Sequence, residues 1–147
     1  MKMPSIRCIL FFVLVQICFL IGSAQNLEVT IRNIRTNRGQ LCVALFNSSE
    51  GFKKEQPCWE KNYDKYRISR DAFSFTISIA PGAYGLSVLD DENRDGKMNY
   101  NWIGVPLEGF GLSGYIHKGI RKPSFNDFIF RVDANQTIKI EVEMKYY

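Results

Sequence analysis

The chain has 147 residues, with 19 lysines and arginines, 15 aspartates and glutamates and one histidine, for a net charge of +4. A net charge this small does not indicate a nucleic acid or an anionic membrane as partner. The length of the chain suits one domain with its own core. His117, Cys42 and Cys58 are too few and too scattered for a zinc site, which takes about four ligands.

The first 24 residues predict a secretory signal peptide. Lys2 and Arg7 form a basic start, residues 8–21 are almost entirely apolar, and residues 22–24 are small, which is the order that a signal peptidase reads. The apolar run is shorter than the ~20 residues that span a bilayer. We expect cleavage after Ala24, a secreted or periplasmic domain over residues 25–147, and no transmembrane segment after cleavage. The alternative is an uncleaved membrane anchor.

Beyond residue 24, apolar and polar residues alternate along most of the chain, as they do in half-buried strands. Leu27, Val29 and Ile31 make one dry face, whereas residues 41–46 are apolar on both faces and predict an interior strand. The turn at 37–39 predicts that these two strands form a hairpin. Further strands are predicted over residues 73–79, 84–88, 128–132 and 138–144, with a seventh near 101–105.

The segment 47–70 has a different pattern. Trp59, Tyr63 and Tyr66 fall at i, i+4 and i+7, which predicts one or two helical turns in a crossover that covers one end of the fold. Short strands separated by turns, without intervening helices, predict an all-β protein. We therefore expect a seven-stranded (six to eight) antiparallel Greek-key β-sandwich of the immunoglobulin-like kind.

Two cysteines, Cys42 and Cys58, remain after the predicted cleavage. An exported protein meets conditions in which disulfides persist, and a bridge between these two would close a loop of about fifteen residues, worth ~3 kcal/mol by chain entropy. The alternative is that Cys42 is a small apolar residue packed in a strand.

The acidic segment 90–99 is the strongest candidate site. Asp91, Asn93 and Asp95 alternate and Gly96 follows, which is the spacing that wraps oxygen ligands around calcium. The Lys97 carbonyl and the Asn99 side chain would add ligands. Position twelve, where an EF-hand has a bidentate glutamate, holds Trp102. The alternative is an acidic turn held by side-chain to backbone hydrogen bonds.

The segment 102–120 is rich in glycine and aromatic residues. Glycine lets backbone approach a ligand, and aromatic rings offer flat apolar platforms. This pattern predicts a ligand-binding loop, and the alternative is a loop whose rings plug the open end of the sandwich. The candidate binding residues are Trp102, Phe110, Tyr115 and His117.

Enzyme motifs are sparse in the sequence. A nucleophile with a histidine base must use His117, and no Gly-x-Ser-x-Gly motif is present. We predict no catalytic residues. A hydrolase of envelope polysaccharide or peptide that uses two carboxylates is the alternative, because carboxylates are plentiful.

An ordered series of motifs runs through the whole domain: residues 39–47, 50–52, 80–88, 90–99, 101–106, 108–111 and 123–125. The series resembles the bacterial domain-of-unknown-function family numbered 2141. That resemblance implies a small exported domain with a prealbumin-like or carboxypeptidase-regulatory-like sandwich, and it implies no activity. Asn99 stands where the acidic segment of the family often ends in aspartate.

These observations together predict an exported, non-enzymatic domain of the cell envelope. It would bind a protein or carbohydrate through the loops at 90–99 and 102–120, or serve a structural role. Calcium is the one cofactor that the sequence suggests, and it would order those loops.

Overall fold

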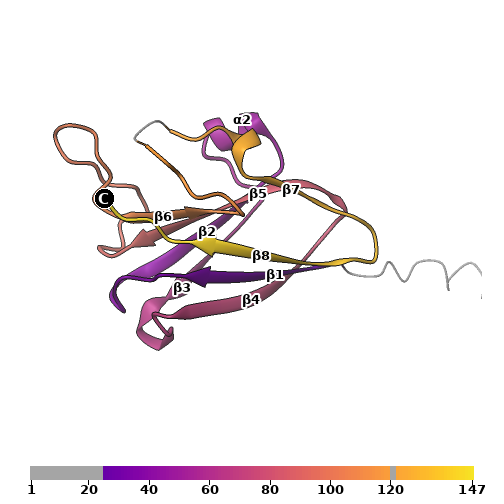
Figure 1. The fold of residues 1–147 in the computed structure, drawn as a ribbon, viewed down its shortest axis with the longest axis horizontal. Helices are drawn as coiled ribbons and strands as arrows, with labels where there is room; N and C mark the ends of the chain where they lie inside the picture. The colour runs from indigo at the N-terminus through magenta and orange to yellow at the C-terminus, as the bar shows by residue number, and fades with distance from the viewer. Residues whose placement is uncertain (1–24, 120–121) are drawn as a thin grey trace, which may run out of the picture.

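A computed structural model describes residues 25–119 and 122–147, so the predicted signal peptide lies outside the described residues. These residues form eight strands in two facing sheets (Figure 1). Three strands make the first sheet, in the order β4(Ala72–Ile79), β1(Gln25–Arg32) and β8(Thr137–Glu143). The all-β prediction is confirmed, with one departure from antiparallel pairing, because β1 and β8 run parallel.

The second sheet has five strands: β3(Trp59–Asp64), β2(Gln40–Phe46), β5(Gly82–Asp91) and β6(Gly109–Leu112), with β7(Ile129–Val132) beside β5. The ten-residue β5 is the longest strand of the sheet. Its first part pairs with β7 and its last part with β6. Within the described residues the helices are three short pieces, α2(Ser49–Lys53), η2(Lys65–Arg67) and η3(Phe125–Asp127).

The main core lies between the two sheets and follows the predicted alternation. Leu27, Val29 and Ile31 of β1 are fully buried, because successive side chains of a strand point to opposite faces. Strands β2 and β5 contribute alternate residues from the opposite sheet. The buried apolar residues of this core are Leu27, Val29, Ile31, Ile34, Leu41, Val43, Leu45, Ile77, Leu86, Val88, Val142 and Met144.

The predicted hairpin of the first two strands is wrong. Strand β1 pairs with β4 and β8, while β2 pairs with β3 and β5 in the other sheet. The connection between them crosses from one sheet to the other, and its Ile34 side chain is buried at the crossing. Turn-forming residues between two strands therefore do not decide that the strands pair with each other, because here both strands pair with strands elsewhere in the chain.

Two more predictions of elements need correction. Residues 59–64 form the edge strand β3 and not a helix, since Trp59 and Tyr63 lie on one face of a strand and Tyr66 is exposed beyond it. Residues 101–105 form a tight turn, closed by a hydrogen bond from the Asn101 N–H to the Val105 carbonyl. The described residues contain no helix long and apolar enough to cross a membrane.

Candidate functional site

The outer face of the second sheet, turned away from the first sheet, is covered by loops. Register places Ala44 opposite Ser87 and Leu89 opposite Phe110 on this face. Helix α2, η3 and the long connections from β5 to β6 and from β6 to β7 lie above it (Figure 1). Strand β2 lies between β3 and β5, as predicted for an interior strand. Its outer face is covered in part, because Phe46 is buried there while Cys42 and Ala44 are half-buried.

One end of this outer face is closed by a second, smaller core. Phe46, Leu112, Phe125 and Phe128 are buried there. The Phe52 ring of α2 packs edge-to-face on Phe46 and Phe128, at centroid distances of 5.3 and 4.9 Å. Such pairs of aromatic rings are individually favourable, so this end is a rigid support.

The acidic loop closes the other end, and its side chains bond mainly to its own backbone. The Asp91 carboxylate accepts the N–H groups of Asp95 and Gly96, at 3.1 and 2.9 Å. The Asn93 amide nitrogen lies 3.0 Å from Asp95 Oδ2 and 2.8 Å from Asn99 Oδ1. The Lys97 N–H donates to Asp95 Oδ1. This is the turn that the alternative interpretation predicts, and its oxygens are nonetheless gathered in a small space.

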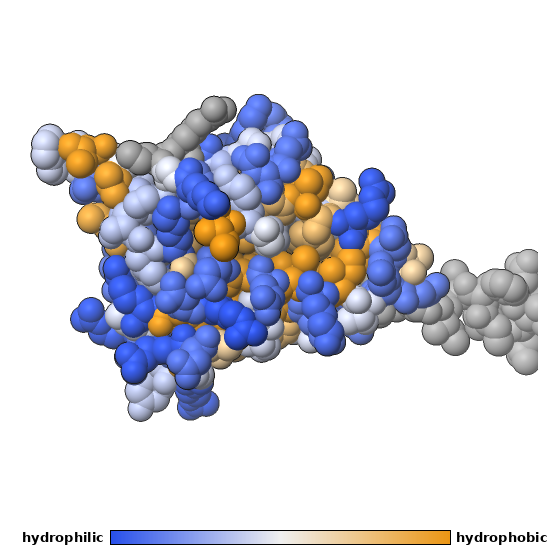
Figure 2. Space-filling view, in the orientation of Figure 1, coloured by the Kyte–Doolittle hydropathy of each residue, from blue (hydrophilic) through white to orange (hydrophobic). Residues whose placement is uncertain are grey.

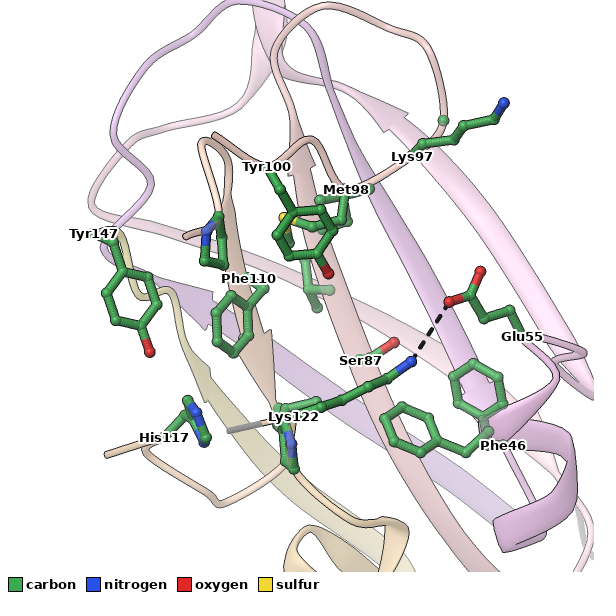
Figure 3. Close-up of a pocket in the computed structure, with 18 of the residues that line it drawn as sticks. Phe46, Glu55, Ser87, Lys97, Met98, Tyr100, Phe110, His117, Lys122 and Tyr147 are labelled. Carbon is green, nitrogen blue, oxygen red and sulfur yellow. Dashed lines mark ion pairs between the residues drawn. The ribbon is translucent and has the colours of Figure 1, made fainter. Parts of the chain in front are cut away.

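Between these two ends lies a groove of about 510 Å³ (Figure 3), a volume typical of sites for small ligands. Ser87 and Leu89 of β5 and Phe110 of β6 form its floor. Its remaining lining comes from the end of β2, from α2, from loops and from the C-terminal residue: Phe46, Phe52, Glu55, Met98, Tyr100, Pro106, His117, Lys122, Pro123 and Tyr147 among others.

The groove is lined by polar as well as apolar side chains, among them Glu55, Ser87, Lys97, His117 and Lys122. Lys122 reaches across toward Glu55, with 3.6 Å between Nζ and Oε1 (Figure 3). The His117 ring, 7% exposed, packs 5.7 Å from the Phe110 ring. Its Nδ1 atom is buried and has no hydrogen-bond partner among the described residues. A buried imidazole nitrogen without a partner is costly.

The four predicted binding residues therefore separate into two groups. Phe110 and His117 line the groove. Tyr115 packs on the smaller core, and Trp102 projects into solvent at 94% exposure on the tip of the 100–106 turn. The sequence could not distinguish these positions, because all four lie in one glycine-rich connection without a regular pattern.

The predicted bridge between Cys42 and Cys58 is absent, and both thiols are free. Cys42 pairs with Asn62, whereas the Cys58 N–H bonds to the Leu45 carbonyl. At ~3.3 Å per residue of strand, the two cysteines are separated by roughly 10 Å along β2, and a disulfide needs Cα atoms within ~7 Å. Burial, followed by the nearby Asp91 charge, raises the pKa of Cys42 to about 12.

A buried ionic cluster was missed from the sequence. Lys65 and Asp90 are both fully buried and form an ion pair. The Tyr146 hydroxyl donates to Asp90 at 2.6 Å, and the Arg35 N–H donates to that hydroxyl at 2.9 Å. In β5, Asp90 follows Leu86 and Val88 at every second position and therefore points into the core with them. This spacing indicates that Asp90 needs a buried partner. Nothing in the sequence pointed to Lys65.

The second residue that was missed is Glu108, directly before β6. It is 6% exposed, its Oε2 accepts the Asn99 N–H at 3.2 Å, and its Oε1 is buried without a hydrogen-bond partner. Burial and then the Asp91 and Asp95 charges raise the pKa of this carboxyl. Within residues 25–119 and 122–147, no three His, Cys, Asp or Glu side chains already converge as metal ligands do.

Comparison with known proteins identifies a family and nothing narrower. No curated protein and no solved structure matches the chain. Residues 29–140, most of the described domain, match the family whose description reads "Uncharacterized protein conserved in bacteria". This span includes the second half of β1, strands β2 to β7, the acidic loop and most of the groove. The chain therefore belongs to that family, DUF2141.

Proposed function

We propose that residues 25–147 form an exported, non-catalytic binding domain that takes an apolar side chain of a partner protein of the cell envelope into the groove. The observation that carries this proposal is the groove itself, with a floor of sheet residues and walls of aromatic rings. A floor on paired strands and an end closed by packed rings keep the site in shape before any ligand arrives, which reduces the entropy lost on binding.

The lining indicates the chemistry of the occupant. Phe46, Met98, Tyr100 and Phe110 present apolar surface, which favours an aromatic or branched side chain. The unpartnered Nδ1 of His117 suits one hydrogen-bonding group, such as a peptide amide or a tyrosine hydroxyl. A sugar would have to exchange several hydroxyl–water bonds for contacts with apolar atoms, which is unfavourable.

The hydrolase alternative has less support. Glycoside hydrolysis needs two carboxyl groups that face each other across a groove, roughly 5–10 Å apart. Among the described residues, Glu55 is the one carboxylate that lines this groove, and it faces Lys122. The acidic loop lies at the end of the groove and directs its carboxylates to its own backbone.

The experiment is an NMR titration of the exported protein with N-acetylphenylalanine amide, with N-acetylglucosamine as the carbohydrate counterpart. We expect the amide resonances of Leu89, Phe110 and His117 to shift with the phenylalanine derivative. Substitution Ser87→Phe, on the groove floor, should abolish those shifts. Thr76→Phe is the matched control, because Thr76 is exposed on β4 in the other sheet.

Three results would count against the proposal. One is the absence of shifts at the groove amides with the phenylalanine derivative. Another is a Ser87→Phe protein that retains dispersed resonances and still binds as the parent does. The third is a response of the groove to N-acetylglucosamine alone, which would assign the site to carbohydrate.

A further inference from the structure

Glu108 is a buried acid that the domain itself does not fully satisfy. The Asn99 N–H of the acidic loop donates to Glu108 Oε2 at 3.2 Å, and a backbone hydrogen bond from Glu92 also lowers the pKa of this carboxyl. Its Oε1 atom is buried and has no partner in good hydrogen-bond geometry among the described residues. An ionised carboxylate removed from water is costly unless a charge or donors compensate it. The lone oxygen therefore needs a cationic or donating group that the described chain does not provide.

The carboxylates nearest to Glu108 make the cost larger. The Asn99 residue links Glu108 to Asp95, because its N–H donates to Glu108 Oε2 at 3.2 Å and its side-chain amide donates to Asp95 Oδ2 at 3.0 Å. The negative charges of Asp91 and Asp95 both raise the pKa of Glu108. The basic side chains around the loop are engaged elsewhere. Arg94 contacts Gly39 and Asp64, and Lys97 extends away from the groove (Figure 3).

The loop oxygens already gather around a positively polarised group. The Asn93 amide nitrogen is within 3.0 Å of Asp95 Oδ2 and 2.8 Å of Asn99 Oδ1, so an NH₂ group lies where those two oxygens converge. Rotation of the Asn93 side chain would turn its own oxygen to the same place. Asp91 Oδ1 accepts one N–H and retains acceptor capacity.

We propose that Glu108 completes a calcium site with the acidic loop. The ligands are the side-chain oxygens of Asp91, Asn93, Asp95 and Glu108, with the Lys97 carbonyl and the Asn99 side chain or a water molecule. The twelfth position of the loop, Trp102, carries no oxygen, and the fold supplies the missing carboxylate from Glu108, beyond the 100–106 turn.

The donor set favours calcium over other cations. It consists of oxygens alone, from three carboxylates and neutral amides and carbonyls, on a loop that adjusts its side chains. Calcium accepts six to eight such ligands in flexible geometry, whereas magnesium demands a near-octahedral arrangement and holds its water. Zinc and copper prefer nitrogen and sulfur. Of the three charged ligands, Asp91 and Glu108 are buried and Asp95 is exposed, and three charged ligands fit the affinity of extracellular calcium modules, ~10⁻⁴–10⁻³ M.

Calcium at this site would hold one wall of the groove. The Leu107 N–H donates to the Asn99 carbonyl at 2.9 Å, so Asn99 and Glu108 close the base of the 100–106 turn. Met98, Tyr100 and Pro106 of this segment line the groove. The expectation that calcium tightens groove binding rests on the proposed function, but the calcium site itself does not.

The experiment measures calcium binding to the exported protein by titration calorimetry, and thermal unfolding in EDTA and in calcium. Saturation near one hundred times Kd should raise the melting temperature by roughly 10 °C, and magnesium at the same concentration should have a much smaller effect. Glu108→Gln should weaken calcium binding at least tenfold. Glu143→Gln, the same change on an exposed residue of β8, is the control and should bind as the parent does.

The EDTA measurement separates binding from folding. Without calcium, Glu108→Gln should unfold at the parent temperature or above it, because the amide removes a buried charge. A parent protein that shows neither heat of binding nor a melting shift at 5 mM calcium, roughly five times the weakest Kd expected, would overturn the proposal. So would a Glu108→Gln protein with parental calcium affinity. Both outcomes leave the groove titration unaffected, so the two proposals fail independently.

Discussion

The buried ion pair gives the sharpest stability prediction. Among residues 25–119 and 122–147, the Lys65 ammonium bonds to Asp90 and to Thr36 Oγ1, the latter at 3.2 Å. Both charged side chains are 0% exposed. The substitution Lys65→Met keeps the length of the side chain and removes its charge. Asp90 then retains one bond, from the Tyr146 hydroxyl, and no counter-charge.

The expected loss is large because the remaining carboxylate stays out of water. Removing one partner of a buried pair typically costs about 3–5 kcal/mol. A domain of this size is stable by roughly 5–15 kcal/mol, so the variant should lose a large part of its free energy of unfolding. In urea, with a slope of about 1.5–2 kcal/mol per molar, the midpoint should fall by about 2 M.

The matched variants identify the cause. The double substitution Lys65→Met/Asp90→Asn removes both charges and keeps an acceptor for Tyr146, and we expect it to recover at least ~2 kcal/mol of the loss. Lys139→Met makes the same change in an exposed pair with Glu28 and should cost less than ~1 kcal/mol. Urea unfolding followed by far-ultraviolet circular dichroism measures all three. A Lys65→Met loss below 1 kcal/mol, or a double variant no more stable than Lys65→Met, would refute the reasoning.

Two further predictions concern cysteine and glycine. Because burial raises the pKa of Cys42 to about 12, its thiolate is scarce at pH 8 and grows as pH rises toward that value. In a protein of residues 25–147, which contains two of the four cysteines, Ellman's reagent should therefore modify one thiol, exposed Cys58, in the native state, and two in denaturant without reductant. A count of zero in denaturant would reinstate the disulfide. Gly39 and Gly104 both have positive φ, but only at Gly39 would a Cβ meet backbone, 2.1 Å from the Asp91 carbonyl oxygen. Gly39→Ala should lower the urea midpoint clearly more than Gly104→Ala, which carries only the left-handed cost of ~1–2 kcal/mol, and equal losses would contradict this account.

Much of the fold could be predicted because the signal was local and periodic. Strands β1, β4, β5 and β8 show apolar residues at every second position, and this alternation directs one face into the core whatever the partner strand is. The apolar run of β2 predicted an interior strand, and β2 lies between β3 and β5. Edge strand β3 was missed because only Trp59 and Tyr63 face inward, and two aromatic residues four apart fit a helix equally well.

The candidate sites were predictable only in part. The spacing of Asp91, Asn93 and Asp95 marked the acidic loop, because those oxygens are neighbours in the chain. Phe110 and His117 were predicted as binding residues, and both line the groove. Trp102 lies in the same glycine-rich segment and received the same prediction, but it is exposed. Lys65 and Glu108 could not be found in this way, because the residues that each of them contacts are distant in the sequence.

The amino-acid sequence alone determined that this protein is built of layered sheets. Alternating apolar side chains give each strand one face that is stable only away from water, and this holds whichever strands pair. The sequence also determined the family and the oxygen-rich loop. Tertiary structure alone decided that β1 and β2 lie in different sheets, that Cys42 and Cys58 stay apart, and that Glu108 lies against the acidic loop. Each of these three features depends on the distance between segments that are far apart in the sequence. The order of residues does not give those distances, which are set only when the chain folds.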